Sequence, residues 1–418
     1  MKMKYYDPNF YICSDEMPFT VKLRCILKDA VDGEALNDAV QTAIKRYPYF
    51  AIRVVRRDEE YLTEPNPLPI AVYEGKNIFP LGSEEVHGHM VALSYSGKEL
   101  YFHFSHVISD GAGFFPFIKT TLYYYFGKRY NTQLDSTDIR LVDTPFYPDE
   151  LCNPYPEEKM KQAKLFYTAD KGDYFEIDKE MYGGGEPMVY YCRVKPKDFM
   201  QFNKRNDGSP CSMGASLIAK VIWNLHPEIE KNIVCDVSFN MRPGLGTPNN
   251  HRMLCKSFPL IYGSKLKSKK FLELGTYSRG MTMLHAQPEN VLYYCENRRK
   301  AVQGIENIPT LAERKKIWGE KALKDANANT FSISYVGQVE MGNMEQYIEA
   351  FYNLTDGSTY KRLFVEINSI GEWFDVAFLQ GFSSDAYFRA FLEQLKENNI
   401  TYTDEGGEPL TVASVCLP

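Results

Sequence analysis

A strand-like run that ends in a histidine and a tight turn constrains this chain more than any other segment. The run reads Tyr101-Phe-His-Phe-Ser-His-Val-Ile-Ser-Asp-Gly111, and its large side chains alternate. Leu100, Phe102 and Phe104 fall on the same face as His106, so the histidine continues a buried apolar row. A strand is rigid, and a histidine at its end is therefore held where a general base is needed.

The segments on either side predict a hairpin before the run and a helix after it. Ser94-Tyr-Ser-Gly-Lys98 is typical of a hairpin turn, with a partner strand over 86–95. After Gly111 the chain continues Ala-Gly-Phe-Phe-Pro-Phe-Ile, an apolar helix entry. A core histidine satisfied by a backbone carbonyl is the alternative interpretation of His106. The Asp-Gly turn beside His106 favours the interpretation that this histidine is functional.

The segment Phe104-Ser-His-Val-Ile-Ser-Asp-Gly111 resembles the active-site motif of the chloramphenicol acetyltransferase-like superfamily. This superfamily contains CoA-dependent acyltransferases, the plant BAHD enzymes and the condensation domains of peptide synthetases; bacterial alcohol acetyltransferase-like proteins are the branch that the chain resembles. Many members carry two adjacent histidines; here Ser105 replaces the first, and His106 matches the second, catalytic one. The resemblance implies an α/β fold, an α+β sandwich of two halves. Each half is a mixed β-sheet covered by helices, and an active-site tunnel lies between them.

Three further segments occur in the order that the superfamily shows. The strand Val234-Cys-Asp-Val-Ser-Phe-Asn-Met-Arg-Pro243 resembles one that ends in Asn-x-Arg-Pro, so Asn240 and Arg242 are expected to support the site. The segment 327–337 resembles a late strand that delivers a hydroxyl or amide toward the catalytic histidine. Arg53, in a predicted strand over 50–55, falls where the family motif places an arginine that pairs with the motif aspartate.

The resemblance also implies roles for the residues of the motif. His106 would remove the proton of the acceptor as the new bond forms, and the ordinary pKa of histidine, near ~6.5, suits this at neutral pH. Asp110, also a candidate catalytic residue, would either orient His106 as in a triad or pair with an arginine and hold the loop, and the second role is expected. Gly111 would permit a backbone conformation that a Cβ opposes, and would leave room for substrate.

A tetrahedral oxyanion forms during acyl transfer and needs a hydrogen-bond donor. The candidates are Thr330, Ser332 and Ser334 on the late strand. We favour Ser332 and Ser334, because their equal parity places both on one strand face. Exposed strand hydroxyls without a catalytic role are the alternative.

The 418 residues allow two to three domains of ordinary size. We expect an N-terminal half over 1–145, a crossover linker over 146–187 with one helix at 157–167, and a C-terminal half over 188–418. In the first half, Asp32 is the expected cap of a helix that ends at Tyr47-Pro48. In the second half, helices are expected at 196–206 and 210–226, the latter capped by Ser209, and Ser384 is expected to cap a last helix. Strands are expected at 188–194, 232–239, 254–262, 330–337, 361–369 and 372–380.

Composition excludes several classes of protein. A net charge of −6 argues against a nucleic-acid surface, and no run of 18 apolar residues predicts a transmembrane helix. Nine cysteines, an odd number in mostly apolar segments, indicate reduced thiols and a cytoplasmic location. The pairs His87-x-His89 and His103-x-x-His106 could suggest a metal, but no cysteine or carboxylate completes a set. We expect no metal, and a monomer.

The predicted function is acyl transfer from acyl-CoA to a hydroxyl or amine acceptor in a ternary complex, with His106 as general base. Acyl-CoA would be a co-substrate, with no bound cofactor, and the basic clusters 265–270 and 298–300 could contact its phosphates or be solvated surface. A condensation-type transferase that uses a carrier protein in trans is one alternative. A non-catalytic binding protein is another, because the first histidine of the motif is missing and the chain lacks a BAHD-style Asp-Phe-Gly-Trp-Gly segment.

Overall fold

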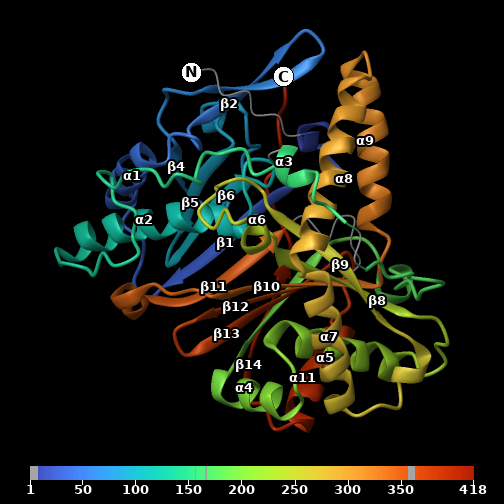
Figure 1. Ribbon diagram of the computed structural model, residues 1–418. Helices are drawn as coiled ribbons and strands as arrows, with labels where there is room; N and C mark the ends of the chain where they lie inside the picture. Colours follow the sequence, from blue (N-terminus) through green and yellow to red (C-terminus); the bar gives the residue numbers. More distant parts are fainter. Residues whose placement is uncertain (1–7, 156, 165–166, 356–362) are drawn as a thin grey trace.

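Two mixed β-sheets organise the chain into two lobes (Figure 1). The computed structural model describes residues 8–155, 157–164, 167–355 and 363–418. The five-stranded sheet has the order β11 (Ile348–Thr355), β1 (Thr20–Leu27), β6 (Glu99–Ser105), β5 (Val91–Ser96) and β4 (Ala71–Glu74). The seven-stranded sheet has the order β14 (Tyr402–Pro409), β7 (Met188–Val194), β13 (Trp373–Gln380), β12 (Leu363–Ile370), β10 (Phe331–Gln338), β8 (Ile233–Asn240) and β9 (Cys255–Tyr262). A separate hairpin joins β2 (Ile52–Arg57) to β3 (Glu60–Pro65).

The first lobe forms where one face of β6 packs on two helices, α1 (Gly33–Ala43) and α2 (Gly111–Tyr130). Leu100, Phe102 and Phe104 are fully buried in this core, as the alternating pattern predicts. The predicted cap of the first helix is confirmed, because the Asp32 carboxylate accepts a hydrogen bond from the Ala35 amide at 3.0 Å. Strands β5 and β6 form the predicted hairpin.

The second lobe packs helices on one face of the seven-stranded sheet. The covering helices are α4 (Pro196–Arg205), α5 (Pro210–Leu225), α7 (Phe271–His285) and α11 (Ala386–Glu397). Ser209 caps α5 as predicted, and Pro210 occupies its first turn. Helices α8 (Pro288–Glu306) and α9 (Leu311–Ala326) form a hairpin that rises beside the first lobe (Figure 1). The remaining short helices are α3 (Glu157–Met160), α6 (Arg242–Leu245), η1 (Pro8–Tyr11), η2 (Ile44–Arg46), η3 (Glu84–Val86), η4 (Glu180–Tyr182), η5 (Ser264–Leu266) and η6 (Gly342–Tyr347).

The sheets do not follow a division of the chain into two continuous halves. Strand β11 belongs to the second half of the sequence, yet it pairs antiparallel with β1 at the edge of the first sheet. The C-terminal tail returns to the first lobe as well, where the Leu81 amide donates to the Ser414 carbonyl at 2.8 Å. The expected range 188–418 for one half is therefore wrong for β11 and for the tail. The sequence pattern also missed β14.

The crossover between the lobes contains less helix than expected. Of the range 157–167, the structure has α3 over Glu157–Met160, and positions 165–166 lie outside the described residues. The expected strand 361–369 is observed as β12, whose first two expected positions also lie outside them. Among the helices that the structure describes, none has the length and apolar character needed to cross a bilayer.

Candidate active site

His106 lies directly after β6, on the loop that leads into α2. Its backbone amide donates to the Phe19 carbonyl at 2.8 Å, and its half-buried ring stacks on the Phe19 ring at a centroid distance of 5.0 Å. The imidazole Nδ1 lies 3.0 Å from the Ser109 carbonyl oxygen. Because a carbonyl only accepts, Nδ1 carries the hydrogen and the lone pair of neutral His106 is on Nε2. The loop thus fixes the orientation and the tautomer of the His106 ring.

Asp110 has a structural role at the start of α2. Its carboxylate is buried and accepts from the Gly113 amide at 2.9 Å, which caps the helix. The same carboxylate accepts two bonds from the Arg242 guanidinium, at 2.8 and 3.0 Å, and one from the Leu254 amide at 2.7 Å. These contacts fix the loop rather than orient the imidazole, so a triad-like role for Asp110 is not what the geometry supports.

The arginine that pairs with Asp110 is Arg242, and the expectation for Arg53 is wrong. Arg53 lies on the isolated β2–β3 hairpin, where its half-exposed side chain approaches Glu64 at 3.5 Å. Arg242 is buried and also bonds the Asn240 side-chain oxygen at 3.1 Å. The resemblance implied that Arg53 pairs with Asp110, but Arg53 lies on β2, which pairs with β3 and not with the first sheet. The strand ending in Asn-x-Arg-Pro supplies the pair instead.

The glycine that the site requires is Gly113 rather than Gly111. Gly111 has no positive φ, and a Cβ there would meet only Val336, at 3.8 Å. A Cβ on Gly113 would lie 2.3 Å from the His251 carbonyl oxygen and 2.8 Å from a guanidinium nitrogen of Arg242. The expectation that Gly111 adopts a backbone conformation opposed by a Cβ is therefore wrong. Close packing of the second lobe on α2 explains the need for a glycine two residues later.

Strand β10 carries the candidate hydroxyls, and Val336 near its end lies next to Gly111. Ile333 packs in the core beneath α5, where its side chain lies beside Gly214, so the opposite face of β10 points away from those helices. Ser332 and Ser334 share that opposite face. Ser332 is buried and its hydroxyl has no hydrogen-bond partner among the described residues, whereas Ser334 is half-buried. The third candidate, Thr330, uses its hydroxyl on the Phe175 carbonyl at 2.6 Å.

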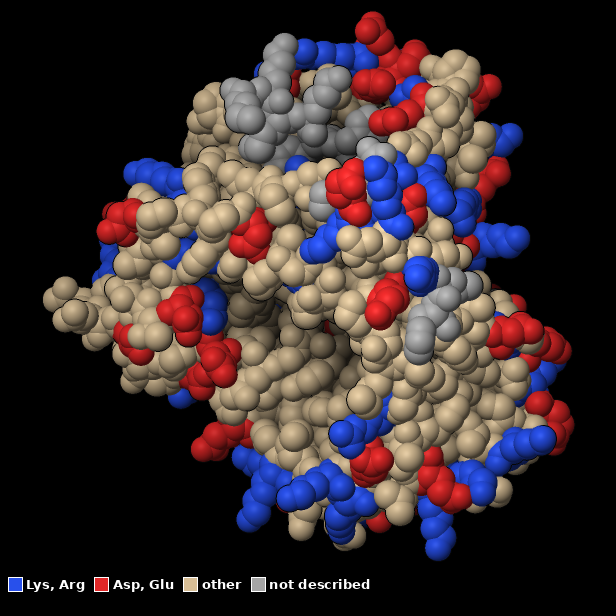
Figure 2. All heavy atoms as spheres, in the orientation of Figure 1, with Lys and Arg blue, Asp and Glu red and all other residues tan. Residues whose placement is uncertain are grey.

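A cavity of about 310 Å³ opens between α2 and the end of β10. Figure 2 shows this face of the molecule hollowed between the lobes, with charges of both signs interspersed around it. Val336 joins the cavity to the motif because it lies next to Gly111. The cavity is lined by Ala112, Phe115, Pro116, Lys119, Asp138, Arg140, Val336, Gln338, Val339 and Glu340.

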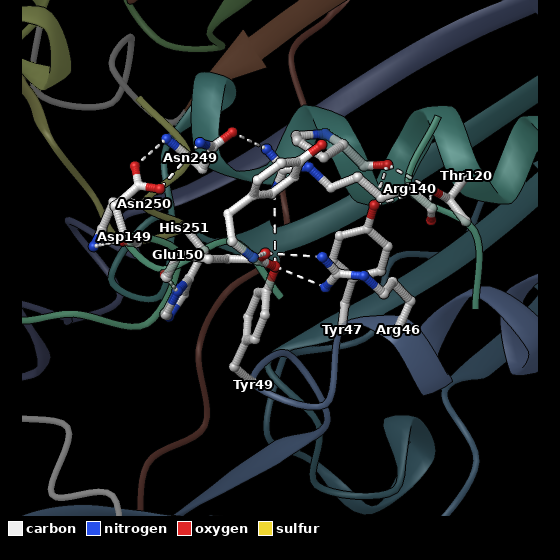
Figure 3. A network of polar contacts seen from close by, with 12 residues as sticks. Arg46, Tyr47, Tyr49, Thr120, Arg140, Asp149, Glu150, Asn249, Asn250 and His251 are labelled. Atoms are coloured by element: carbon white, nitrogen blue, oxygen red, sulfur yellow. Dashed lines mark hydrogen bonds and ion pairs between the residues drawn. The ribbon is translucent and has the colours of Figure 1, made fainter. Parts of the chain in front are cut away.

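A buried polar network joins the loop of His106 to the second lobe and the crossover. Figure 3 shows its centre, where Glu150 lies among Arg46, Tyr49 and His251. The Ser109 hydroxyl donates to the His251 carbonyl at 2.6 Å, and His251 Nδ1 lies 2.7 Å from the Glu150 carbonyl. Burial lowers the pKa of His251 to about 3, so its ring is neutral and donates from Nδ1. The Glu150 carboxylate takes two bonds of 2.8 Å from the Arg46 guanidinium and one of 2.6 Å from the Tyr49 hydroxyl.

Sequence reasoning missed this network. Glu150 and His251 are far apart in sequence and belong to no recognisable motif. In the sequence, Glu150 follows an aromatic, proline-rich stretch, and this pattern does not specify a partner for its carboxylate. The network nevertheless supports the carbonyl that orients His106.

The remaining histidines do not gather into a metal site. His103 bonds the Ser94 hydroxyl at 2.9 Å through Nε2, and His89 Nε2 lies 2.8 Å from the Leu68 carbonyl. No group of three or more histidine, cysteine, aspartate or glutamate side chains with metal-binding geometry occurs in the described part of the chain.

No protein-family model and no curated protein sequence matches the chain. Solved structures do resemble it. F. graminearum TRI101, complexed with coenzyme A and deoxynivalenol, has 11% identity, a TM-score of 0.59, and a match that covers 96% of this chain and 99% of that one. The first condensation domain of the CDA synthetase has 11% identity, 91% coverage of each chain and a TM-score of 0.58. Polyketide synthase associated protein 5 from Mycobacterium tuberculosis has 12% identity, a TM-score of 0.56, and coverage of 94% of this chain and 97% of that one.

These similarities establish the fold. The chain has the fold of TRI101 and of this condensation domain, two lobes whose mixed sheets are covered by helices.

Proposed function

We propose that this protein transfers an acyl group from acyl-CoA to a hydroxyl or amine acceptor, with His106 as the general base. The observation that carries the proposal is the Ser109 carbonyl, which holds the hydrogen on Nδ1 of His106 and leaves Nε2 as the base. The fold supports it, because F. graminearum TRI101 with this fold was solved with coenzyme A. Acyl-CoA enters as a substrate, and the chain needs no resident cofactor for this reaction.

The reaction balances with His106 alone as the proton carrier. Nε2 takes the acceptor proton while the acceptor oxygen or nitrogen attacks the thioester carbon. The resulting imidazolium is stabilised because Nδ1–H already points at the Ser109 carbonyl oxygen. Collapse of the tetrahedral intermediate breaks the carbon–sulfur bond, and the proton passes from Nε2 to the departing thiolate. A positioned base of this kind contributes about 10²–10⁴-fold in rate.

The oxyanion of that intermediate requires a donor, and Ser334 is the proposed one. It is half-buried on the face of β10 that points away from α5, two residues before Val336, which lies against Gly111. Ser332 lies further from the end of the strand and is buried. In the proposed site the Ser332 hydroxyl lies on the same face of β10 as Ser334 and is not itself the oxyanion donor. Loss of one such donor costs about 10²–10³-fold in kcat.

The test is release of free thiol from a panel of acyl-CoAs supplied with small alcohols and amines. We expect turnover by the wild type and a loss of about 10²–10⁴-fold in His106→Ala. His87→Asn is the matched control, since His87 is exposed, has a positive φ that asparagine tolerates, and should keep wild-type rates. Equal rates for wild type and His106→Ala would refute the general-base role.

The same assay separates the alternatives. The structural similarity to a condensation domain supports a condensation-type transferase as the alternative. Such an enzyme would transfer acyl groups faster from a carrier protein than from CoA, so the two rates are compared for the same acyl group. Absence of turnover with every donor would favour a binding protein that keeps the fold.

A further inference from the structure

A second polar cavity lies on the opposite side of the five-stranded sheet from α1 and α2. Its volume is about 50 Å³, and strands β1, β5 and β6 form its floor, with β14 and the following tail at its wall. The alternation of β6 explains its chemistry: Phe102 and Phe104 face the helices, whereas Tyr101 and His103 face this cavity. The cavity is lined by Lys22, Lys76, Ile78, Ser94, Tyr101, His103, Glu408, Pro409 and Thr411.

Lys22 is a buried cation without a carboxylate partner. It is only 7% exposed, and its Nζ donates to the Thr411 hydroxyl at a long 3.3 Å. No ion pair within 4.0 Å involves this ammonium among the described residues. Burial lowers the pKa of Lys22 to about 8; the nearby Glu408 and Glu99 carboxylates oppose this decrease, and the charges of Arg24 and Lys76 add to it. An ammonium in this position gains from any anion that enters the cavity.

His103 supplies an unused hydrogen-bonding group to the same cavity. It is 1% exposed, and Nδ1 has no hydrogen-bond partner in the part of the chain that the structure describes. When the Ser94 hydroxyl donates to Nε2, at 2.9 Å, Nδ1 carries the hydrogen. Burial lowers the pKa of His103 to about 3, so the ring is a neutral donor. A buried N–H without an acceptor destabilises the fold, and a ligand in the cavity that accepts from it would remove this cost.

The carboxylates at the rim are already engaged. Glu99 accepts from Arg24 and, at 2.5 Å, from the Tyr101 hydroxyl. Glu408 accepts from Arg24 at 3.3 Å and from the Tyr191 hydroxyl at 2.8 Å. Neither carboxylate makes an ion pair with Lys22. The cations Lys22, Arg24 and Lys76 outnumber the two carboxylates by one, and Tyr101 and Tyr191 are neutral because burial raises the pKa of each.

We propose that this cavity binds a small monocarboxylate, with Lys22 and His103 as the donors to its two oxygens. One unbalanced positive charge matches a monoanion. The volume also fits, because about 10–15 Å³ of such space holds one water and this cavity has room for a few non-hydrogen atoms. The site is separate from that of His106, so the proposal stands whether or not the protein transfers acyl groups.

The experiment is an NMR titration with sodium acetate, observed on isotope-labelled histidine side chains of the full chain, which has seven histidines. We expect one buried histidine, His103, to shift in a saturable way with acetate and not with sodium chloride at equal ionic strength. Affinity should fall between about pH 7 and about pH 9.5, because Lys22 loses its proton in that interval. No saturable shift of His103 would overturn the proposal, as would tighter binding of phosphate than of acetate.

Variants assign the site to its residues. Lys22→Met should weaken acetate at least about tenfold by removing a charge-assisted bond, and Lys76→Met should weaken it less. Lys76 is mostly exposed, so its variant tests the cavity even where the change at Lys22 impairs folding. Lys128→Met is the matched control on the exposed side of α2 and should leave affinity unchanged. Wild-type affinity in both cavity variants would overturn the assignment.

Discussion

At the scale of single residues, His106 and Asp110 have different hydrogen-bond partners and therefore different roles. The Ser109 carbonyl accepts from Nδ1 of His106, which puts the lone pair of the neutral ring on Nε2, the atom that we propose as the base. Asp110 instead joins α2 to the second lobe through Arg242. An uncompensated buried charge would remain if either partner of this pair were removed, which is why the pair is sensitive to substitution.

Asp110→Ala should lower the free energy of unfolding by about 3–5 kcal/mol, because Arg242 would be left buried and unpaired and α2 would lose its cap. Urea denaturation measures this. Arg53→Ala is the control, since the half-exposed Arg53–Glu64 contact of 3.5 Å should contribute less than about 1 kcal/mol. A larger loss for Arg53→Ala than for Asp110→Ala would contradict the pairing.

The two glycines of α2 should respond in opposite ways to alanine. Gly113→Ala places a methyl group 2.3 Å from the His251 carbonyl oxygen and should cost about 1–3 kcal/mol or more through overpacking. Gly111→Ala meets only Val336 at 3.8 Å and should be neutral or stabilising by up to about 1 kcal/mol, since alanine favours helix. Thermal unfolding of both variants decides this. Equal destabilisation would indicate that Gly111 has a steric role after all.

At the scale of elements, the site is an assembly of three loops. The loop from β6 to α2 holds His106, and the loop from β8 to β9 supplies Arg242 and the His251 carbonyl. The crossover supplies Glu150, which ties His251 to Arg46 at the end of η2. Each loop forms hydrogen bonds or ion pairs with buried polar groups of another loop, so the conformation of each loop depends on the other two.

Glu150→Gln should lower the free energy of unfolding by about 3–5 kcal/mol at neutral pH, because Arg46 loses its buried partner. Burial by itself would raise the pKa of the Glu150 carboxyl, but hydrogen bonds from Arg46 and Tyr49 outweigh burial and hold that pKa below its usual range. The carboxylate therefore stabilises the fold above its unfolded pKa, near ~4.3, and this stabilisation is lost as pH falls through the lower folded value.

Urea denaturation at several pH values between about 3 and 6 measures this contribution. Stability of the wild type should decline more steeply on acidification than that of Glu150→Gln. Parallel pH profiles would show that the carboxylate has the same pKa folded and unfolded.

At the scale of the whole molecule, the lobes are interwoven rather than merely in contact. Strand β11 completes the first sheet, and the amide of its Phe351 donates to the Asp375 carboxylate of β13, at 2.8 Å, in the second lobe. Asn353 of β11 likewise donates to Asn368 of β12 at 2.9 Å. Strand β11 therefore links the two sheets directly.

A fragment of residues 1–187 should not fold alone, although it contains the whole motif. Without β11, strand β1 would expose an unpaired edge over Val21–Leu27, and apolar core surface would lie open. Circular dichroism and thermal melting should show no cooperative transition for the fragment and a single one for the full chain. A cooperative, monomeric fragment would contradict this interweaving.

Much of the local structure could be predicted from the sequence, because periodicity and caps act within a few residues. The strand of Phe102 and Phe104, the cap at Asp32 and the capped helix at Ser209 follow from such short-range physics. Strand β11 was not predicted, because five consecutive positions, 350–354, are buried and the strand therefore lacks the alternation of a half-exposed strand. No local pattern says which sheet it joins.

The sequence by itself determined that a histidine follows a buried strand, beside an aspartate that begins a helix. Only the tertiary structure decided that Asp110 pairs with Arg242 and not with Arg53, that Gly113 is the tightly packed glycine, and that Glu150 supports the loop. The physical reason is distance along the chain: caps and alternation depend on neighbours, whereas ion pairs and steric limits depend on segments that only folding brings together.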